Sequence, residues 1–128
     1  MDFYYSVVTE KTVDEAVRAL EESLQAHQFG VLWKLDLSSK LQEKGVDFRI
    51  PYRILEVCNP HEAKKVLTQN LLVGYFLPCK IVVYEQNGKT HIGLPKPSQL
   101  MDIIGDSTLS SIAQDVETSL VQAIDAAK

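Results

Sequence analysis

The sequence predicts an α+β fold in which helices cover one face of a mostly antiparallel sheet of about four to five strands. Two apolar runs flank Asn87-Gly88, a pair of residues typical of a tight β-hairpin turn. Apolar residues recur at helical spacing near both ends of the chain, and helices and strands alternate irregularly. A length of 128 residues suits a single domain over residues 1–128.

The N-terminal part predicts a strand followed by a helix. Residues 3–8 are apolar enough for a strand. Thr12 and Glu15 then have the spacing of a capping box, in which each side chain accepts a hydrogen bond from a free backbone N–H. The helix ends near His27, with Gly30 just beyond it. Its apolar stripe comprises Val13, Ala16, Val17, Leu20 and Leu24.

The next segment predicts two strands with a short helix between them. Residues 31–37 alternate with period two, which places one set on the core face and the other in solvent. The core set is Val31, Trp33, Leu35 and Leu37, and the solvent set is Leu32, Lys34 and Asp36. Residues 39–44 form a short helical turn closed by Gly45, and residues 53–58 form the third strand.

The clearest local signal is a helix start at Asn59. Asn is a preferred N-cap, and Pro60 falls at the first helical position, where its missing N–H costs nothing. Glu62 lies where a carboxylate can reach back to the cap. A helix over residues 60–70 follows, and its buried side is predicted to hold Ala63, Val66 and Leu67.

The C-terminal part predicts a hairpin and two helices. In the hairpin, strands 81–84 and 90–94 pair Val83 with Ile92 and Tyr84 with His91. Ser98 is expected to cap a short helix that ends at Gly105, and Ser107 to cap the last helix. The apolar stripe of that last helix is Leu109, Ile112, Val116, Leu120, Ala123 and Ile124.

Composition excludes several classes of protein. A formal net charge of −4 with one basic doublet argues against nucleic acid as a partner. The N-terminus lacks the pattern of a signal peptide, and no apolar run is long enough to span a membrane. We therefore expect a cytoplasmic protein with reduced cysteines. If the protein is exported or has a redox function, a Cys58–Cys79 disulfide is possible, because the spacing of the two cysteines alone neither establishes nor excludes it.

Several short motifs occur in a family-like order. Leu55-Glu56-Val57-Cys58-Asn59-Pro60 is followed by Leu77-Pro78-Cys79-Lys80 and Val83-Tyr84-Glu85. This order resembles the family catalogued as domain of unknown function 302 (DUF302), over a core of about residues 29–97. The resemblance implies a small α+β fold of the TATA-binding-protein-like type and a homodimer. It implies no reaction, so Cys58, Asn59, Pro60 and Cys79 are flagged only as motif positions.

The helix start also carries candidate metal ligands. The positive end of the helix dipole favours a neutral His61 imidazole, which is able to bind a metal, and it stabilises a Cys58 thiolate. With Cys79 and Glu62, these residues form a zinc-like ligand set. The pattern lacks the usual Cys-x-x-Cys pair, and Glu62 also has the capping role. Burial of both cysteines as small core residues is the alternative.

Residues 71–77 are too apolar for an ordinary solvent loop. We expect Tyr75 and Phe76 to contribute to a homodimer interface or to the wall of a pocket beside Cys79. A small-ligand site is predicted where this segment meets the helix start at Asn59, Pro60 and His61, because pockets combine apolar walls with a few polar groups.

Three hypotheses of function follow. The first is a non-catalytic homodimeric module that binds a small ligand or a divalent metal near the helix start. The second is a thiol-dependent enzyme or redox sensor that uses Cys58 or Cys79, with His61 or His91 as the base. The third is a structural domain with buried cysteines. The chain lacks nucleotide-binding and serine-hydrolase motifs, and the sequence leaves open whether the protein is an enzyme.

Overall fold

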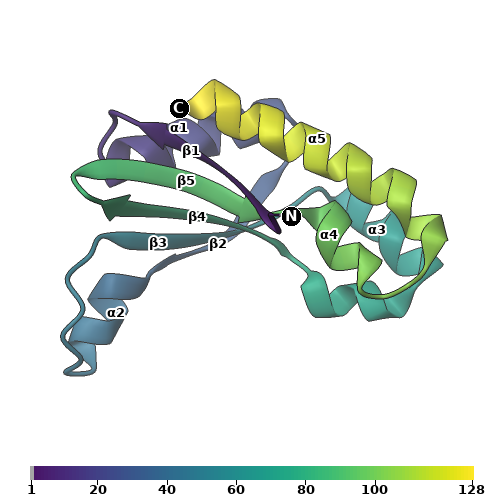
Figure 1. Ribbon diagram of the computed structural model, residues 1–128, viewed down its shortest axis with the longest axis horizontal. Helices are drawn as coiled ribbons and strands as arrows, with labels where there is room; N and C mark the ends of the chain where they lie inside the picture. Colours follow the sequence, from purple (N-terminus) through teal and green to yellow (C-terminus); the bar gives the residue numbers. More distant parts are fainter. Residues whose placement is uncertain (1) are drawn as a thin grey trace.

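Five antiparallel strands form the sheet in the computed structural model, which describes residues 2–128 (Figure 1). The strand order is β1-β5-β4-β3-β2. The strands are β1 (Tyr4–Thr9), β2 (Gly30–Asp36), β3 (Tyr52–Cys58), β4 (Cys79–Gln86) and β5 (Lys89–Pro95). The α+β class predicted from the sequence is confirmed, as is the β4–β5 hairpin, in which Val83 pairs with Ile92 and Tyr84 with His91.

Five α-helices and two short 3-10 helices complete the fold. The helices are α1 (Val13–Ala26), α2 (Leu37–Glu43), α3 (Pro60–Gln69), η1 (Leu71–Phe76), α4 (Pro97–Asp102), η2 (Ser107–Leu109) and α5 (Ser110–Ala127). The long helices α1 and α5 cover one face of the sheet, whereas α2 projects from the opposite side (Figure 1). No helix among residues 2–128 is both long and apolar enough to cross a membrane.

The main core lies between the sheet and these two long helices. The apolar stripes of α1 and α5 pack against alternate side chains of the central strands, such as Leu55, Val57, Ile81 and Val83. The capping box predicted at Thr12 is present, with Glu15 accepting from the Thr12 N–H at 2.9 Å and donating its own N–H to Thr12 Oγ1. No long helix among residues 2–128 covers the opposite face of the sheet, and it is there that the site is found.

A second, smaller core joins η1, α3 and α4 to the start of α5. It consists of the buried residues Val66, Val73, Met101, Leu109 and Ala113. This cluster lies beyond the end of the sheet. It holds η1, the segment that connects α3 to β4, in place through the buried side chain of Val73. The apolar segment 71–77 is therefore ordered by its own small core.

Two predicted helix caps were wrong. Ser98 does not cap α4; its N–H and hydroxyl both donate to Glu117 Oε1 of α5, at 3.0 and 2.5 Å. Ser107 begins the 3-10 turn η2, and the cap there is Asp106, which accepts from the Thr108 N–H. In both cases a carboxylate, and not the predicted serine hydroxyl, accepts the hydrogen bond from the free backbone N–H.

The burial predicted for β2 was wrong for Trp33, whereas Val31 does pack against the main core. A register shift between Val31 and Trp33 interrupts the period-two pattern. Trp33 is 54% exposed and does not join the core, and Leu32 is exposed as well. The strand ends at Asp36, which caps α2 by accepting from the Ser39 N–H, so Leu37 belongs to the helix. The bulge thus turns two large apolar side chains toward the uncovered part of the molecule.

Candidate functional site

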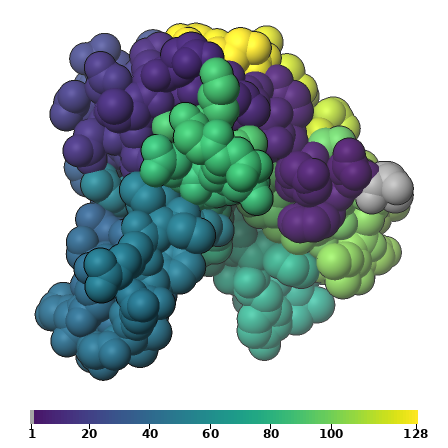
Figure 2. Space-filling model, turned by 60° about the vertical axis from the view of Figure 1, so that its left-hand side comes forward, coloured from purple at the N-terminus to yellow at the C-terminus, as the bar shows by residue number. Residues whose placement is uncertain are grey.

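A cavity of about 490 Å³ opens at one end of the uncovered sheet face. Figure 2 shows the surface hollowed between the blue segment that carries α2 and the teal segment that carries η1. Such a volume lies within the range of small-molecule sites, which are concave and mostly apolar. The lining residues come from β2, β3, η1, β4, the end of β5 and α4.

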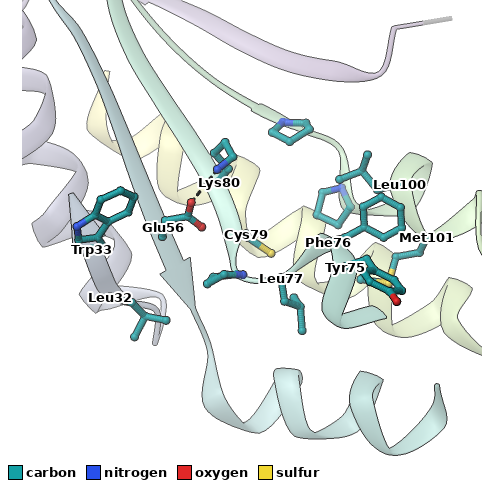
Figure 3. A pocket seen from close by; sticks show the side chains of 13 residues that line it. Leu32, Trp33, Glu56, Tyr75, Phe76, Leu77, Cys79, Lys80, Leu100 and Met101 are labelled. Atoms are coloured by element: carbon teal, nitrogen blue, oxygen red, sulfur yellow. Dashed lines mark hydrogen bonds and ion pairs between the residues drawn. The ribbon is translucent and has the colours of Figure 1, made fainter. Parts of the chain in front are cut away.

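The cavity walls are apolar on opposite sides. Leu32 and Trp33 of β2 form one wall, and Phe76, Leu100 and Met101 line the other (Figure 3). Pro95 and Pro97 close the end near α4, and the other apolar lining residues are Tyr75, Leu77 and Pro78. Flat aromatic and proline rings on facing walls favour a ligand with an apolar body.

Two hydrogen-bonded links hold the far wall in place. Asn70 accepts from the Leu72 N–H at the start of η1 and donates to Asp106 Oδ2 at 3.2 Å. Ser98, through Glu117, fixes α4 against α5. Because these links join the wall to α5 and to the cap residue of η2, the cavity is built into the fold and does not depend on a loose loop.

Glu56 and Lys80 are the charged side chains of the cavity. They are directly paired across β3 and β4, and Lys80 Nζ donates to Glu56 Oε1 at 2.7 Å (Figure 3). The Glu56 side chain is 17% exposed and that of Lys80 is 44% exposed. The cavity therefore has no net charge, but it holds one ammonium and one carboxylate side by side.

Cys79 separates this cavity from a much smaller one. The smaller space, about 20 Å³, lies beside Cys58, Asn59 and Glu62, and holds roughly one water. Cys79, Leu77 and Met101 line both spaces. The helix start predicted as the ligand site therefore borders only the small space, whereas the large cavity lies on the other side of Cys79.

The predicted metal ligands do not converge. Asn59 caps α3, accepting from the N–H groups of His61 and Glu62 at 3.1 and 3.3 Å. His61 is exposed and lies with Lys64 and Lys65 at the outer surface of α3. Among residues 2–128, no group of three or more His, Cys, Asp and Glu side chains is placed to hold a metal ion. The Glu62 carboxylate pairs with Lys65 and does not return to the Asn59 N–H.

Both cysteines are free thiols, and neither is activated. Burial raises the pKa of the Cys79 thiol to about 11, with smaller contributions from Cys58 and Glu56, and burial also raises the pKa of Cys58. At neutral pH, roughly one Cys79 in ten thousand would be the thiolate that a nucleophile requires. His91 of β5 stacks on Tyr84 of β4, with the ring centroids 5.2 Å apart. Tyr84 is five residues further along β4 than Cys79. Among the described residues, no hydrogen bond joins either cysteine to His61 or His91, the two bases that the sequence suggested.

The cavity was only partly visible in the sequence. Residues 75–77 and Cys79 do line one cavity together, next to the end of β4. The opposite wall was missed because the bulge that exposes Leu32 and Trp33 has no clear sequence signal. The Glu56–Lys80 pair was missed because the register between β3 and β4 was not predicted.

The comparisons agree with the fold and add no activity. The family described as "Domain of unknown function DUF302" matches residues 5–127, a wider span than the core of residues 29–97. The crystal structure of an uncharacterized conserved DUF302 protein from Bacillus stearothermophilus is similar over 100% of both chains, with 51% identity and a TM-score of 0.98. No curated protein matches the chain.

Proposed function

The chain belongs to the DUF302 family, and we propose that it is a non-catalytic module that binds a small, largely apolar ligand in the cavity between β2, η1 and α4. The observation that carries this proposal is the cavity itself, about 490 Å³ with two apolar walls, of which the η1–α4 wall is anchored by the second core. Binding requires no nucleophile and no base, which suits a site whose one thiol, Cys79, has a raised pKa.

Isothermal titration calorimetry with indole and toluene tests the proposal. We expect saturable binding at one site per chain, because both probes are apolar and smaller than the cavity. In Leu100→Lys, a charge enters the apolar wall, and binding should be lost. Ile103→Lys is the matched control, since Ile103 lies just beyond α4, is 74% exposed and does not line the cavity. Binding that survives Leu100→Lys, or is absent from the wild type, would contradict the proposal.

The same module is proposed to be a homodimer that associates through the outer surface of η1. Leu71 and Tyr75 are more than 80% exposed, and Leu72 beside them is also exposed. Large apolar side chains gathered on one short element are typical of a protein interface. Phe76 is half-buried and lines the cavity, so its role is in the wall.

Sedimentation velocity tests the interface. The double variant Leu71→Ser/Tyr75→Ser should sediment as a monomer with an unchanged circular dichroism spectrum, while the wild type sediments as a dimer. Val46→Ser removes an exposed apolar side chain outside η1 and should leave the dimer intact. A monomeric wild type, or a dimer that persists in the double variant, would refute the η1 interface. We place the module in the cytoplasm, where two free thiols remain reduced.

A further inference from the structure

The charged pair in the cavity indicates what kind of head group a ligand would carry. Glu56 accepts one hydrogen bond, from Lys80, and its Oε2 atom has no hydrogen bond among the described residues. A carboxylate can accept about four hydrogen bonds, and an ammonium can donate three. Glu56 can therefore accept further hydrogen bonds, and Lys80 can donate further ones, to a ligand in the cavity that both side chains line.

Both charged groups reach the cavity, although the Glu56 side chain is the less exposed of the two. A charged donor or acceptor on a ligand could therefore form a charge-assisted hydrogen bond at the free positions of either group. Lys80 alone would favour an anionic ligand, but Glu56 beside it would repel that anion. Glu56 alone would favour a cation, which Lys80 would repel. A ligand with a single charge therefore meets one attractive and one repulsive partner.

We propose that the cavity binds a zwitterionic α-amino acid with a large apolar side chain. Its carboxylate would lie against Lys80 and its ammonium against Glu56, giving four alternating charges. Its side chain would lie between Trp33 and Phe76, the aromatic rings of the two walls (Figure 3). The ligand has no net charge, and neither has the charged pair. This inference rests on the proposed ligand-binding function and names the ligand class of the same cavity.

Calorimetry with four matched probes tests the head group. L-Phenylalanine carries both charges, 3-phenylpropionate only the carboxylate, 2-phenylethylamine only the ammonium, and toluene neither. We expect L-phenylalanine to bind at least about tenfold more tightly than each of the others, because it forms two charge-assisted contacts and each of its charges lies closer to the opposite charge than to the like one.

Variants assign each contact. In Glu56→Gln the advantage of L-phenylalanine over 3-phenylpropionate should disappear, and in Lys80→Met its advantage over 2-phenylethylamine should disappear. Lys89→Met is the control, because Lys89 pairs with Glu10 and lines no part of the cavity. Circular dichroism confirms that each variant is folded.

The outcomes separate this inference from the proposed function. If toluene or a singly charged probe binds as tightly as L-phenylalanine, the amino-acid inference is overturned while ligand binding stands. If L-phenylalanine is preferred but both variants retain that preference, the assignment to Glu56 and Lys80 is overturned. If none of the four probes binds, both proposals are overturned.

Discussion

Replacing Leu109 by Ala tests whether the second core holds the cavity wall. Leu109 is fully buried against a cluster that includes Val73 of η1 and Met101 of α4. Truncation of a fully buried leucine costs about 3 kcal/mol, from lost apolar burial and the space left behind. For 128 residues the entropy of unfolding is about 270 cal/mol/K at about 2.1 cal/mol/K per residue, so the midpoint should fall by about 11 °C.

Leu120→Ala is the matched control for this prediction. Leu120 is also fully buried, but it lies in the main core between α5 and the sheet. Both variants should lose similar free energy of unfolding in urea titrations, whereas only Leu109→Ala should weaken toluene binding in calorimetry, because Met101 can then move into the new space. A loss below about 1 kcal/mol for Leu109→Ala, or equal weakening of binding in both variants, would refute the supporting role of the second core.

Three further predictions concern stability. Gly93→Ala should lower the free energy of unfolding by about 1–3 kcal/mol in urea titrations, because its new Cβ would lie 3.0 Å from Ser6 Cβ. Gly74→Ala is the control, since its new Cβ would make only ordinary contacts and should leave that free energy unchanged. Asn59→Ala should cost about 1 kcal/mol through loss of the α3 cap, and an unchanged midpoint would refute that role. Cys79 ionises near pH 9 when unfolded and about 11 when folded, so stability should fall as pH rises through this window, and less steeply in Cys79→Ala.

Local signals in the sequence predicted the fold well where each depends on neighbouring residues. The capping box at Thr12, the Asn59 cap and the hairpin at Asn87-Gly88 each involve contacts within a few positions, and all three are present. The caps at Ser98 and Ser107 failed because the competing acceptors, Glu117 and Asp106, were not weighed; Glu117 is distant in sequence.

The wall beside Cys79 was predicted, whereas the rest of the cavity escaped prediction because it depends on contacts between residues distant in sequence. Its walls depend on a bulge in β2, on the β3–β4 register and on the packing of η1 against α4, none of which is a local property. Cys58 and His61 are chemically reactive residue types, but neither lines the larger space. Trp33 and the prolines do line it, and nothing local in the sequence indicates that they lie opposite Phe76.

The central claim is that a small apolar ligand occupies this cavity, and the side chain of Trp33 tests it most directly. Trp33 is the single tryptophan of the chain and lies in the cavity wall, so its indole Nε1–H gives one assignable cross-peak in a ¹⁵N-labelled sample. During titration with toluene, we predict a saturating shift of this cross-peak together with the backbone amides of Phe76, Leu77 and Met101. Saturable binding that leaves the Trp33 cross-peak unmoved, or no binding, would contradict the account.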